Sequence, residues 1–192
     1  MLPSEKQVEE HYASNHVPYR SWCKACVMGK GVNSAHFRTE KEEEQAVSTV
    51  SIDYAFMTHD DVKESEAGYM PILVMLDRNT GKLNANVVPA KGVNPYAVMR
   101  TAQNVKLLGY DKVLFKCDQE PAIVALRDAV KRELQMAVVP EESPVGESQS
   151  NGEVEGAVNM VKAQIRAMRL SLESRYKTTR QLSKKVTQLS LG

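Results

Sequence analysis

Runs of apolar and β-branched residues define the strands that the sequence predicts. Three such runs come first, each bounded by polar residues: 47–57, 71–77 and 83–90. Asn79, Thr80 and Gly81 separate the second run from the third and are typical of a tight turn. The three runs predict an antiparallel meander, and two shorter strands are expected at residues 112–117 and 136–140.

Apolar residues at steps of three and four predict helices between and after these strands. The first covers residues 94–108, with an Asn as its cap, a Pro at its first position and Gly109 just past its end. The second runs from about residue 120 to 135. Residues 140–152, rich in Pro, Gly, Ser and Glu, predict a long flexible stretch before a long last helix. This order predicts an α/β fold, a mixed sheet with helices on its faces.

The last predicted helix has two neighbouring stripes of side chains. The apolar stripe, expected to be buried, consists of Val154, Val158, Val161, Ile165, Met168 and Leu172. The polar stripe consists of Glu155, Asn159, Lys162, Arg166 and Arg169. A carboxylate followed by an amide and three cations suits a metal site that continues into a phosphate-binding surface. A solvated helix surface has the same composition, so the choice depends on whether other carboxylates lie nearby.

Two aspartates lie on predicted apolar strands: Asp53 inside the first and Asp118 at the end of the fourth. An unpaired carboxylate is costly to bury there unless a cation or hydrogen bonds compensate it. A single one is more often a cap or turn residue. Because crossover connections bring the ends of parallel strands together, the two aspartates are expected to share a site with Glu155 if their strands are neighbours.

Composition and charge limit the classes of function. The chain has 192 residues, 42% hydrophobic and 26% charged, which fits one globular domain with a small appendage. No apolar run approaches the ~20 residues that cross a bilayer, and three cysteines, an odd number, suit a reducing intracellular compartment. The net charge of +1 conceals a division, because residues 1–150 carry 17 Lys and Arg against 21 Asp and Glu, whereas residues 151–192 carry 8 against 3. A nucleic acid is therefore expected to meet the C-terminal helix and tail.

The first 36 residues contain few aliphatic side chains from which to build a core. They hold His11, His16, Cys23 and Cys26 in the pattern His-x4-His-x6-Cys-x2-Cys. Two imidazoles and two thiolates are a ligand set for one tetrahedral Zn²⁺, and a bound ion would order such a segment. A redox-active cysteine pair is the alternative, but the flanking sequence lacks the strand and helix of a thioredoxin-like motif.

Together these residues resemble a known family. Asp53 in VSIDYAF, Asp118 in LFKCDQEPAI and Glu155 in SQSNGEVEGAVNMVKAQIRAM resemble the D,D,E catalytic core of retroviral and retrotransposon integrases, members of the ribonuclease-H-like superfamily. The most specific part is Asn-Gly-x-x-Glu at the last helix. The His-His-Cys-Cys segment resembles the zinc module that precedes integrase cores. Its gap between the second His and the first Cys is shorter than in retroviral integrases, which leaves His36 as an alternative ligand to His11.

The resemblance implies an activity and its cofactors. Asp53, Asp118 and Glu155 would hold two Mg²⁺ or Mn²⁺ ions for phosphodiester cleavage and DNA strand transfer. The residues expected to contact nucleic acid are Asn159, Lys162, Arg166 and Arg169. Element ends and target DNA are the implied partners, with a homo-oligomer as the working form and a nuclear location implied by the resemblance alone. An inactive nucleic-acid-binding remnant, a ribonuclease-H-type nuclease and a zinc-dependent protein-interaction module remain alternatives.

The resemblance also implies how the chain is divided. Residues 1–37 form the His-His-Cys-Cys module, 38–46 a charged linker, and 47–175 a ribonuclease-H-like catalytic core on a mixed five-stranded sheet. The polar, basic residues 176–192 are expected to be disordered. A chain that ends in this way resembles a C-terminally truncated piece of a retroelement Pol polyprotein.

Overall fold

The computed structural model describes residues 3–30, 47–57, 70–142 and 148–176. The chain divides into two compact units, each described by itself: the His–Cys unit (Met1–Ala35 with Met160–Gly192) and the core unit (His36–Asn159). The predicted linker at 38–46, the alternative ligand His36 and nearly all of the predicted tail at 176–192 lie outside the described residues. The predicted domain boundaries stay predictions.

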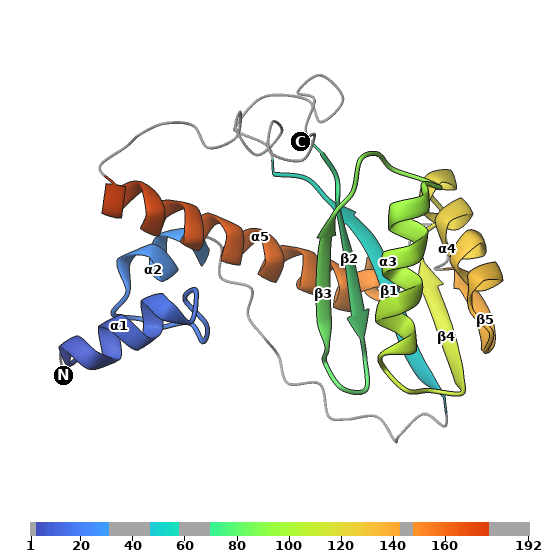
Figure 1. The fold of residues 1–192 in the computed structure, drawn as a ribbon, viewed down its shortest axis with the longest axis horizontal. Coiled ribbons are helices and arrows are strands. Elements are labelled where there is room, and N and C mark those ends of the chain that lie inside the picture. Colours follow the sequence, from blue (N-terminus) through green and yellow to red (C-terminus); the bar gives the residue numbers. More distant parts are fainter. Residues whose placement is uncertain (1–2, 31–46, 58–69, 143–147, 177–192) are drawn as a thin grey trace. The chain divides into compact units, whose positions relative to one another are not determined.

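A mixed five-stranded sheet forms the centre of the core unit, in the order β3, β2, β1, β4, β5 (Figure 1). The strands are β1 (Ser48–Ala55), β2 (Ile72–Asp77), β3 (Leu83–Val87), β4 (Lys112–Cys117) and β5 (Ala137–Glu142). β1, β2 and β3 pair antiparallel, whereas β4 pairs parallel with β1 and β5 pairs parallel with β4. The predicted antiparallel meander and the predicted mixed five-stranded sheet are both confirmed.

The parallel pairing of β1 with β4 decides where the predicted aspartates lie. Ser51 is level with Lys116 in this pair. Asp53 lies two residues beyond Ser51 on β1, and Asp118 lies two residues beyond Lys116, directly after the end of β4. The two aspartates therefore come at the same end of this strand pair. Because strand side chains alternate between the two faces of a sheet, Asp53 projects from the face opposite to that of Tyr54.

Two helices cover one face of the sheet (Figure 1). α3 (Pro95–Lys106) follows Asn94, whose side-chain oxygen accepts a hydrogen bond from the Ala97 N–H at 2.8 Å, and α4 is Pro121–Glu133. The core between the helices and this face includes Val50, Ile52, Tyr54, Val105, Phe115, Leu126 and Val130. Each large apolar side chain buried in this way contributes roughly 1.5–3 kcal/mol. This packing fixes the position of β1, which carries Asp53, and of the end of β4, which Asp118 directly follows.

The predicted flexible stretch at 140–152 is wrong at both ends, because β5 extends to Glu142 and α5 (Ser148–Tyr176) already begins at Ser148. β5 extends because its backbone pairs with the end of β4, with Glu142 opposite Cys117. Backbone pairing of this kind does not depend on an apolar composition. Pro140 is compatible with β5 because this strand lies at the edge of the sheet.

Helix α5 carries residues of both units, since the division falls between Asn159 and Met160. The predicted apolar stripe is buried at Val154, Val158 and Val161 and partly buried at Ile165 and Met168. The predicted burial of Leu172, the last member of this stripe, is wrong, because this residue is 44% exposed. Leu170 packs against Cys23, Ala25 and Cys26 instead, so that packing sets the buried face near the end of α5. None of the helices that the structure describes is long and apolar enough to span a membrane.

The His–Cys unit combines two short helices with the end of α5. α1 (Glu5–Ala13) begins with a capping box in which the side chains of Ser4 and Gln7 each accept a hydrogen bond from the other's backbone N–H. α2 (Lys24–Lys30) follows the first cysteine. The buried side chains of this unit are few, as the sequence predicts, and they centre on the two cysteines and Ala25.

Gly29 of α2 lies directly against Ala167 of α5. A β-carbon on Gly29 would lie 2.7 Å from the Ala167 backbone nitrogen and 2.9 Å from its Cα and Cβ. These distances are shorter than any normal contact, so only glycine fits without a shift of the backbone. Arg166 Nε donates a hydrogen bond to the Gly29 carbonyl at 3.0 Å. The last turns of α5 are therefore an integral part of the His–Cys unit.

Candidate functional site

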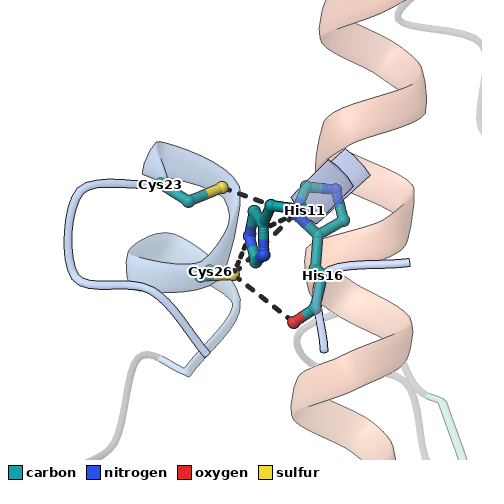
Figure 2. Close-up of side chains that lie close together, drawn as sticks. All are labelled: His11, His16, Cys23 and Cys26. Carbon is teal, nitrogen blue, oxygen red and sulfur yellow. Dashed lines mark hydrogen bonds between the residues drawn. The ribbon is translucent and has the colours of Figure 1, made fainter. Parts of the chain in front are cut away.

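The four ligands predicted from the N-terminal spacing converge in the His–Cys unit, and we call His11, His16, Cys23 and Cys26 the His–Cys cluster (Figure 2). Their ligand atoms all lie within 4.8 Å of one another, and all four residues are buried. Asn15 and His16 adopt positive φ values of 53° and 65°, which are uncommon for residues other than glycine. This turn after α1 brings the His16 ring back to the His11 ring.

The distances between ligand atoms match a tetrahedral zinc site. His11 Nε2 lies 3.3 Å from His16 Nδ1 and 3.2 Å from Cys26 Sγ. His16 Nδ1 lies 3.4 Å from Cys23 Sγ and 3.8 Å from Cys26 Sγ. With zinc–nitrogen bonds of about 2.0–2.1 Å and zinc–sulfur bonds of about 2.3 Å, tetrahedral edges are roughly 3.3 Å between nitrogens and roughly 3.6 Å between nitrogen and sulfur. The four residues fit Zn²⁺ in both chemistry and spacing.

Burial favours the protonation state of the two imidazoles that a metal ion requires. Burial lowers the pKa of His11, and the positive charges of His16 and Arg20 lower it further. Burial also lowers the pKa of His16, and neutral imidazole is the form that binds a metal. The His11 ring meets the Trp22 ring edge-on, with centroids 5.0 Å apart. The structure thus brings His11 into the cluster, whereas His36 lies outside the described residues.

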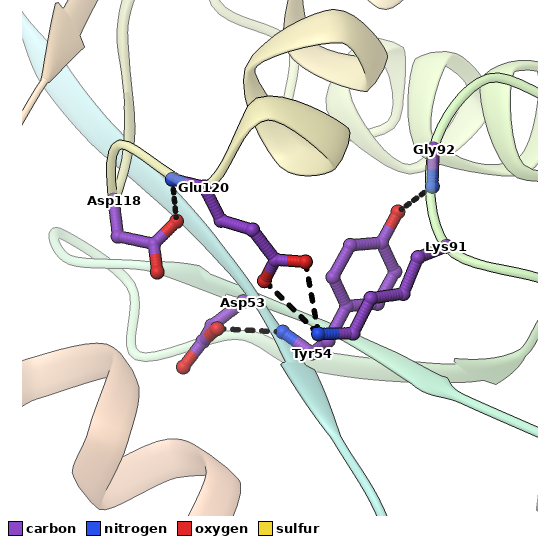
Figure 3. A network of polar contacts seen from close by, with 6 residues as sticks. All are labelled: Asp53, Tyr54, Lys91, Gly92, Asp118 and Glu120. Atoms are coloured by element: carbon purple, nitrogen blue, oxygen red, sulfur yellow. Dashed lines mark hydrogen bonds and ion pairs between the residues drawn. The ribbon is translucent and has the colours of Figure 1, made fainter. Parts of the chain in front are cut away.

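The carboxylates predicted to be catalytic all belong to the core unit. Asp53 projects from β1, Asp118 directly follows β4, and Glu155 lies on α5. The Tyr54 N–H donates to Asp53 Oδ1 at 2.7 Å, and the Glu120 N–H donates to Asp118 Oδ1 at 3.1 Å. Figure 3 shows the two aspartates at neighbouring strand ends. Both are partly buried, whereas Glu155 is exposed.

The pKa of Asp53 records how these carboxylates influence one another. Burial raises this pKa from 3.8 to about 6, the hydrogen bond from Tyr54 opposes the rise, and the negative charges of Asp118, Glu155 and Glu120 add to it. Asp53, Asp118 and Glu155 therefore share one electrostatic environment. A raised pKa in such a group is typical of catalytic and metal-binding sites. The oxygen donors fit a hard divalent cation such as Mg²⁺, which would compensate their excess negative charge.

The three carboxylates are not gathered as tightly as the His–Cys cluster. Among the residues that the structure describes, that cluster is the one group of three or more donors close enough to hold a metal ion as it stands. Arg78 Nε pairs with Glu153 at 3.1 Å and so ties the early part of α5 to the turn between β2 and β3. No sequence pattern predicts this contact.

Of the four residues predicted to contact nucleic acid, two have intramolecular partners. Arg166 donates to a backbone carbonyl of α2, as described above, and Arg169 Nε lies 3.5 Å from a carboxylate oxygen of Glu173. Asn159 is exposed and Lys162 is partly exposed. The role of these four residues in binding nucleic acid stays a prediction.

Sequence reasoning misses an ion pair beside the carboxylates. Lys91 Nζ donates to both carboxylate oxygens of Glu120, at 2.9 and 3.0 Å (Figure 3). Glu120 comes two residues after Asp118, which marks it as a neighbour of the predicted site. Lys91 lies 29 positions earlier, in the loop between β3 and α3. No periodicity links the two positions, so only the folded chain reveals the pair.

Comparisons with known proteins find that part of this chain is similar in structure to solved retroviral intasome and integrase chains. No protein-family model and no curated protein matches the sequence. The chain is similar to a chain of the simian T-cell lymphotropic virus intasome in complex with PP2A regulatory subunit B56 gamma, with a TM-score of 0.46 and 14% identity over 62% of this chain and 46% of that one. It is also similar to the HTLV-2 integrase catalytic core domain in complex with magnesium in a dimeric form, with a TM-score of 0.38 and 12% identity over 62% and 81%. The match spans less than half of the intasome chain.

Proposed function

We propose that this chain is the core of an integrase-type polynucleotidyl transferase that cleaves and joins DNA phosphodiesters through Asp53, Asp118 and Glu155. The observation that carries the proposal is the placement of Asp53 on β1 and of Asp118 directly after β4, its parallel neighbour, with Glu155 close enough to raise the pKa of Asp53. The sheet order and the His–Cys cluster agree with the architecture that the sequence resemblance implies.

The carboxylates act in this proposal by binding metal. Divalent ions such as Mg²⁺ or Mn²⁺, when bound, stabilise the attacking and leaving oxygens of an in-line displacement at phosphorus. Asp53 and Asp118 supply oxygen ligands that backbone N–H groups already orient. With a pKa of about 6, Asp53 is charged at neutral pH and becomes protonated below it. We therefore expect metal binding and activity to fall as the pH drops through about 6.

The His–Cys cluster has a separate task in the proposal, which is to hold one structural Zn²⁺. All four ligand positions of a tetrahedral ion are filled by side chains, so no position is left for water or substrate. Zinc bound in this way would order a unit with few buried apolar residues. It takes no part in the chemistry.

The proposed partners are DNA ends and a target duplex. Asn159 and Lys162 are the exposed or partly exposed members of the polar stripe that follows Glu155. Contacts from such side chains to backbone phosphates set the position of DNA without reading its sequence. We expect the active form to be a homo-oligomer, as the resemblance implies.

The direct test is strand transfer by the purified full chain. A labelled duplex with a free 3′-hydroxyl end is incubated with a target plasmid and Mg²⁺ or Mn²⁺, and joined products are separated on a denaturing gel. We expect products that require the divalent ion and that fall at least about a hundredfold in Asp118→Asn, because one ligand is lost. Asp111→Asn, at the opposite end of β4, is the matched control and should keep activity.

Other outcomes select the alternatives. DNA binding without joined products in any divalent ion would favour an inactive remnant. Degradation of the RNA strand of an RNA–DNA hybrid without joining would favour a ribonuclease-H-type nuclease. Equal activity in the wild type and in Asp118→Asn would remove the D,D,E assignment.

A further inference from the structure

The ammonium group of Lys91 is held in place by contacts from several directions. It donates to both oxygens of Glu120. It also lies 5.6 Å from the ring centroid of Tyr54 and 5.1 Å from that of Phe56, which is within the range of cation–π attraction. Figure 3 shows the group between Glu120 and the Tyr54 ring. A lysine side chain held in this way has a defined position for its charge.

The loop that carries Lys91 is tied to the same strand ends as the predicted catalytic aspartates. The Gly92 N–H donates to the Tyr54 hydroxyl oxygen at 2.9 Å, and Tyr54 directly follows Asp53. Glu120, the ion-pair partner, donates its N–H to Asp118. The ammonium group is therefore anchored through the immediate neighbours of both aspartates.

Stability alone is a weak reason for this arrangement. The side chains of Lys91 and Glu120 are 34% and 33% exposed, and ion pairs that water reaches add little to folding. The same exposure lets the ammonium group change partner at low cost. Such an exchange has a use here, because a phosphodiester that approaches Asp53, Asp118 and Glu155 meets like charge. A fixed cation at the edge of the site would offset that repulsion.

We propose that Lys91 is a phosphate-binding residue of the carboxylate site, which exchanges Glu120 for a backbone phosphate when DNA binds. The inference deepens the proposed function and rests on it for the identity of the ligand. In the free protein Glu120 and the two aromatic rings keep the ammonium group in position. In the complex a phosphate oxygen takes the place of the Glu120 carboxylate.

The test measures how DNA affinity depends on salt in the full chain. A fluorescein-labelled DNA duplex of random sequence is titrated with protein at several KCl concentrations, in Ca²⁺ so that no cleavage interferes. Loss of one phosphate contact lowers the slope of log Kobs against log salt by about 0.9. We expect this loss in Lys91→Gln, with an affinity about three- to tenfold weaker at low salt. Lys91→Arg should restore both values.

Two further variants separate a phosphate contact from general effects. Lys82→Gln removes the same charge from the exposed turn between β2 and β3, at the other end of the sheet, and should leave the slope unchanged. Glu120→Gln removes the ion pair but keeps the ammonium group. Lys91→Gln should still lower the slope in that background, because its effect does not pass through Glu120.

Four results would overturn the proposal. Two concern single variants: an unchanged slope in Lys91→Gln, or an equal loss of slope in Lys82→Gln. The others are a Lys91→Gln effect that disappears in the Glu120→Gln background, and a wild-type chain that does not bind DNA.

The binding measurements and the strand-transfer assay can fail independently. A chain that shows the expected slopes but joins no DNA would keep Lys91 as a phosphate ligand and remove the transferase assignment. If the wild-type chain joins DNA but Lys91→Gln has the same slope as the wild type, the transferase assignment is kept and Lys91 is removed as a phosphate ligand.

Discussion

The two groups of candidate metal ligands differ in how closely the chain gathers them. The His–Cys cluster brings four ligand atoms within 4.8 Å of one another. Asp53, Asp118 and Glu155 share one electrostatic environment, but they are not gathered in the same way. The first group is preassembled by the fold, whereas the second would be completed by the ion that it binds.

The difference follows from the charge on the ligands. Imidazoles with a lowered pKa are neutral, so the two histidines of the His–Cys cluster approach each other and the cysteines without a large electrostatic cost. Carboxylates at neutral pH repel one another, and the cost grows as water is excluded. A carboxylate site therefore stays open until a cation enters it. Burial is the main cause of the raised pKa of Asp53, and repulsion from the neighbouring carboxylates adds to it.

Removal of a thiolate from the His–Cys cluster should give the largest effect. We expect the wild-type chain to carry one zinc ion and Cys23→Ser to carry none, with unfolding of the His–Cys unit. Structural zinc contributes on the order of 10 kcal/mol to small zinc domains. Zinc content by mass spectrometry and the fluorescence of Trp22, the single tryptophan, report the two losses.

Cys117→Ser is the matched control for this prediction. Cys117 is buried in the core unit and belongs to no metal cluster among the described residues. It should keep one zinc ion per chain. Stoichiometric zinc in Cys23→Ser would contradict the zinc assignment.

The packing of α5 against α2 gives the next largest effect. Gly29→Ala adds a β-carbon 2.7 Å from the Ala167 backbone, and we expect a loss of about 1–3 kcal/mol in the free energy of unfolding. Gly156→Ala, in α5 with nothing within 4 Å of the added atom, should instead gain up to about 1 kcal/mol from helix propensity. Denaturant unfolding followed by Trp22 fluorescence and circular dichroism measures both. A gain in Gly29→Ala would show that the two helices do not pack as described.

Asp53→Asn should stabilise the protein at neutral pH while it abolishes the proposed activity. The pKa of Asp53 is about 6 in the folded chain and 3.8 when unperturbed, so the folded state binds the proton more tightly. Its charge therefore begins to cost stability as the pH rises above about 4, and the full cost is present above 6. After a discount for partial exposure, the Asn variant should gain about 1–2 kcal/mol at pH 7.5 and nothing near pH 3.5.

Asp77→Asn provides the opposite case within the same sheet. Burial alone would raise the pKa of Asp77, but hydrogen bonds from Ser48, Thr80 and Tyr110 outweigh it and lower the pKa. That carboxylate stabilises the fold above its unfolded pKa, and the stability is lost as the pH falls. Asp77→Asn should therefore destabilise the chain at pH 7.5. A loss of stability in both variants would contradict the account of Asp53.

The smallest effect is stabilisation by a divalent cation. A ligand at ten times its Kd stabilises the folded state by about 1.4 kcal/mol. We expect Mg²⁺ to raise the melting temperature of the wild type at pH 7.5 but not that of Asp118→Asn, with Asp111→Asn behaving like the wild type. An equal shift in all three chains would mean that the ion acts elsewhere.

Local patterns were enough to predict most of the core unit. The strand predictions agree with β1, β2 and β4 because each strand buries most of its apolar side chains, and this burial leaves a local apolar pattern in the sequence. Asn94 caps α3 as predicted, because its side chain meets the backbone only three residues away. The spacing of the two histidines and two cysteines also predicted their cluster, since a metal ligand set leaves a chemical signature in residue type.

The features that the sequence did not predict depend on contacts between segments that are distant in the chain. Glu141 and Glu142 belong to β5 because β4 offers a backbone to pair with, which their own composition does not reveal. Leu172 is exposed because Ala167 and Leu170 provide the contacts of α5 with residues 23–29. The Lys91–Glu120 pair links residues 29 positions apart. In each case the deciding partner lies outside the window in which periodicity carries information.

The most direct test of the central claim is anomalous diffraction from crystals grown or soaked in Mn²⁺. The account predicts anomalous peaks at about 2.0–2.3 Å from carboxylate oxygens of Asp53 and Asp118, with Glu155 drawn in as a further ligand. Asp118→Asn crystals under the same conditions should lose these peaks. Full Mn²⁺ occupancy elsewhere, with none among these three carboxylates, would contradict the account.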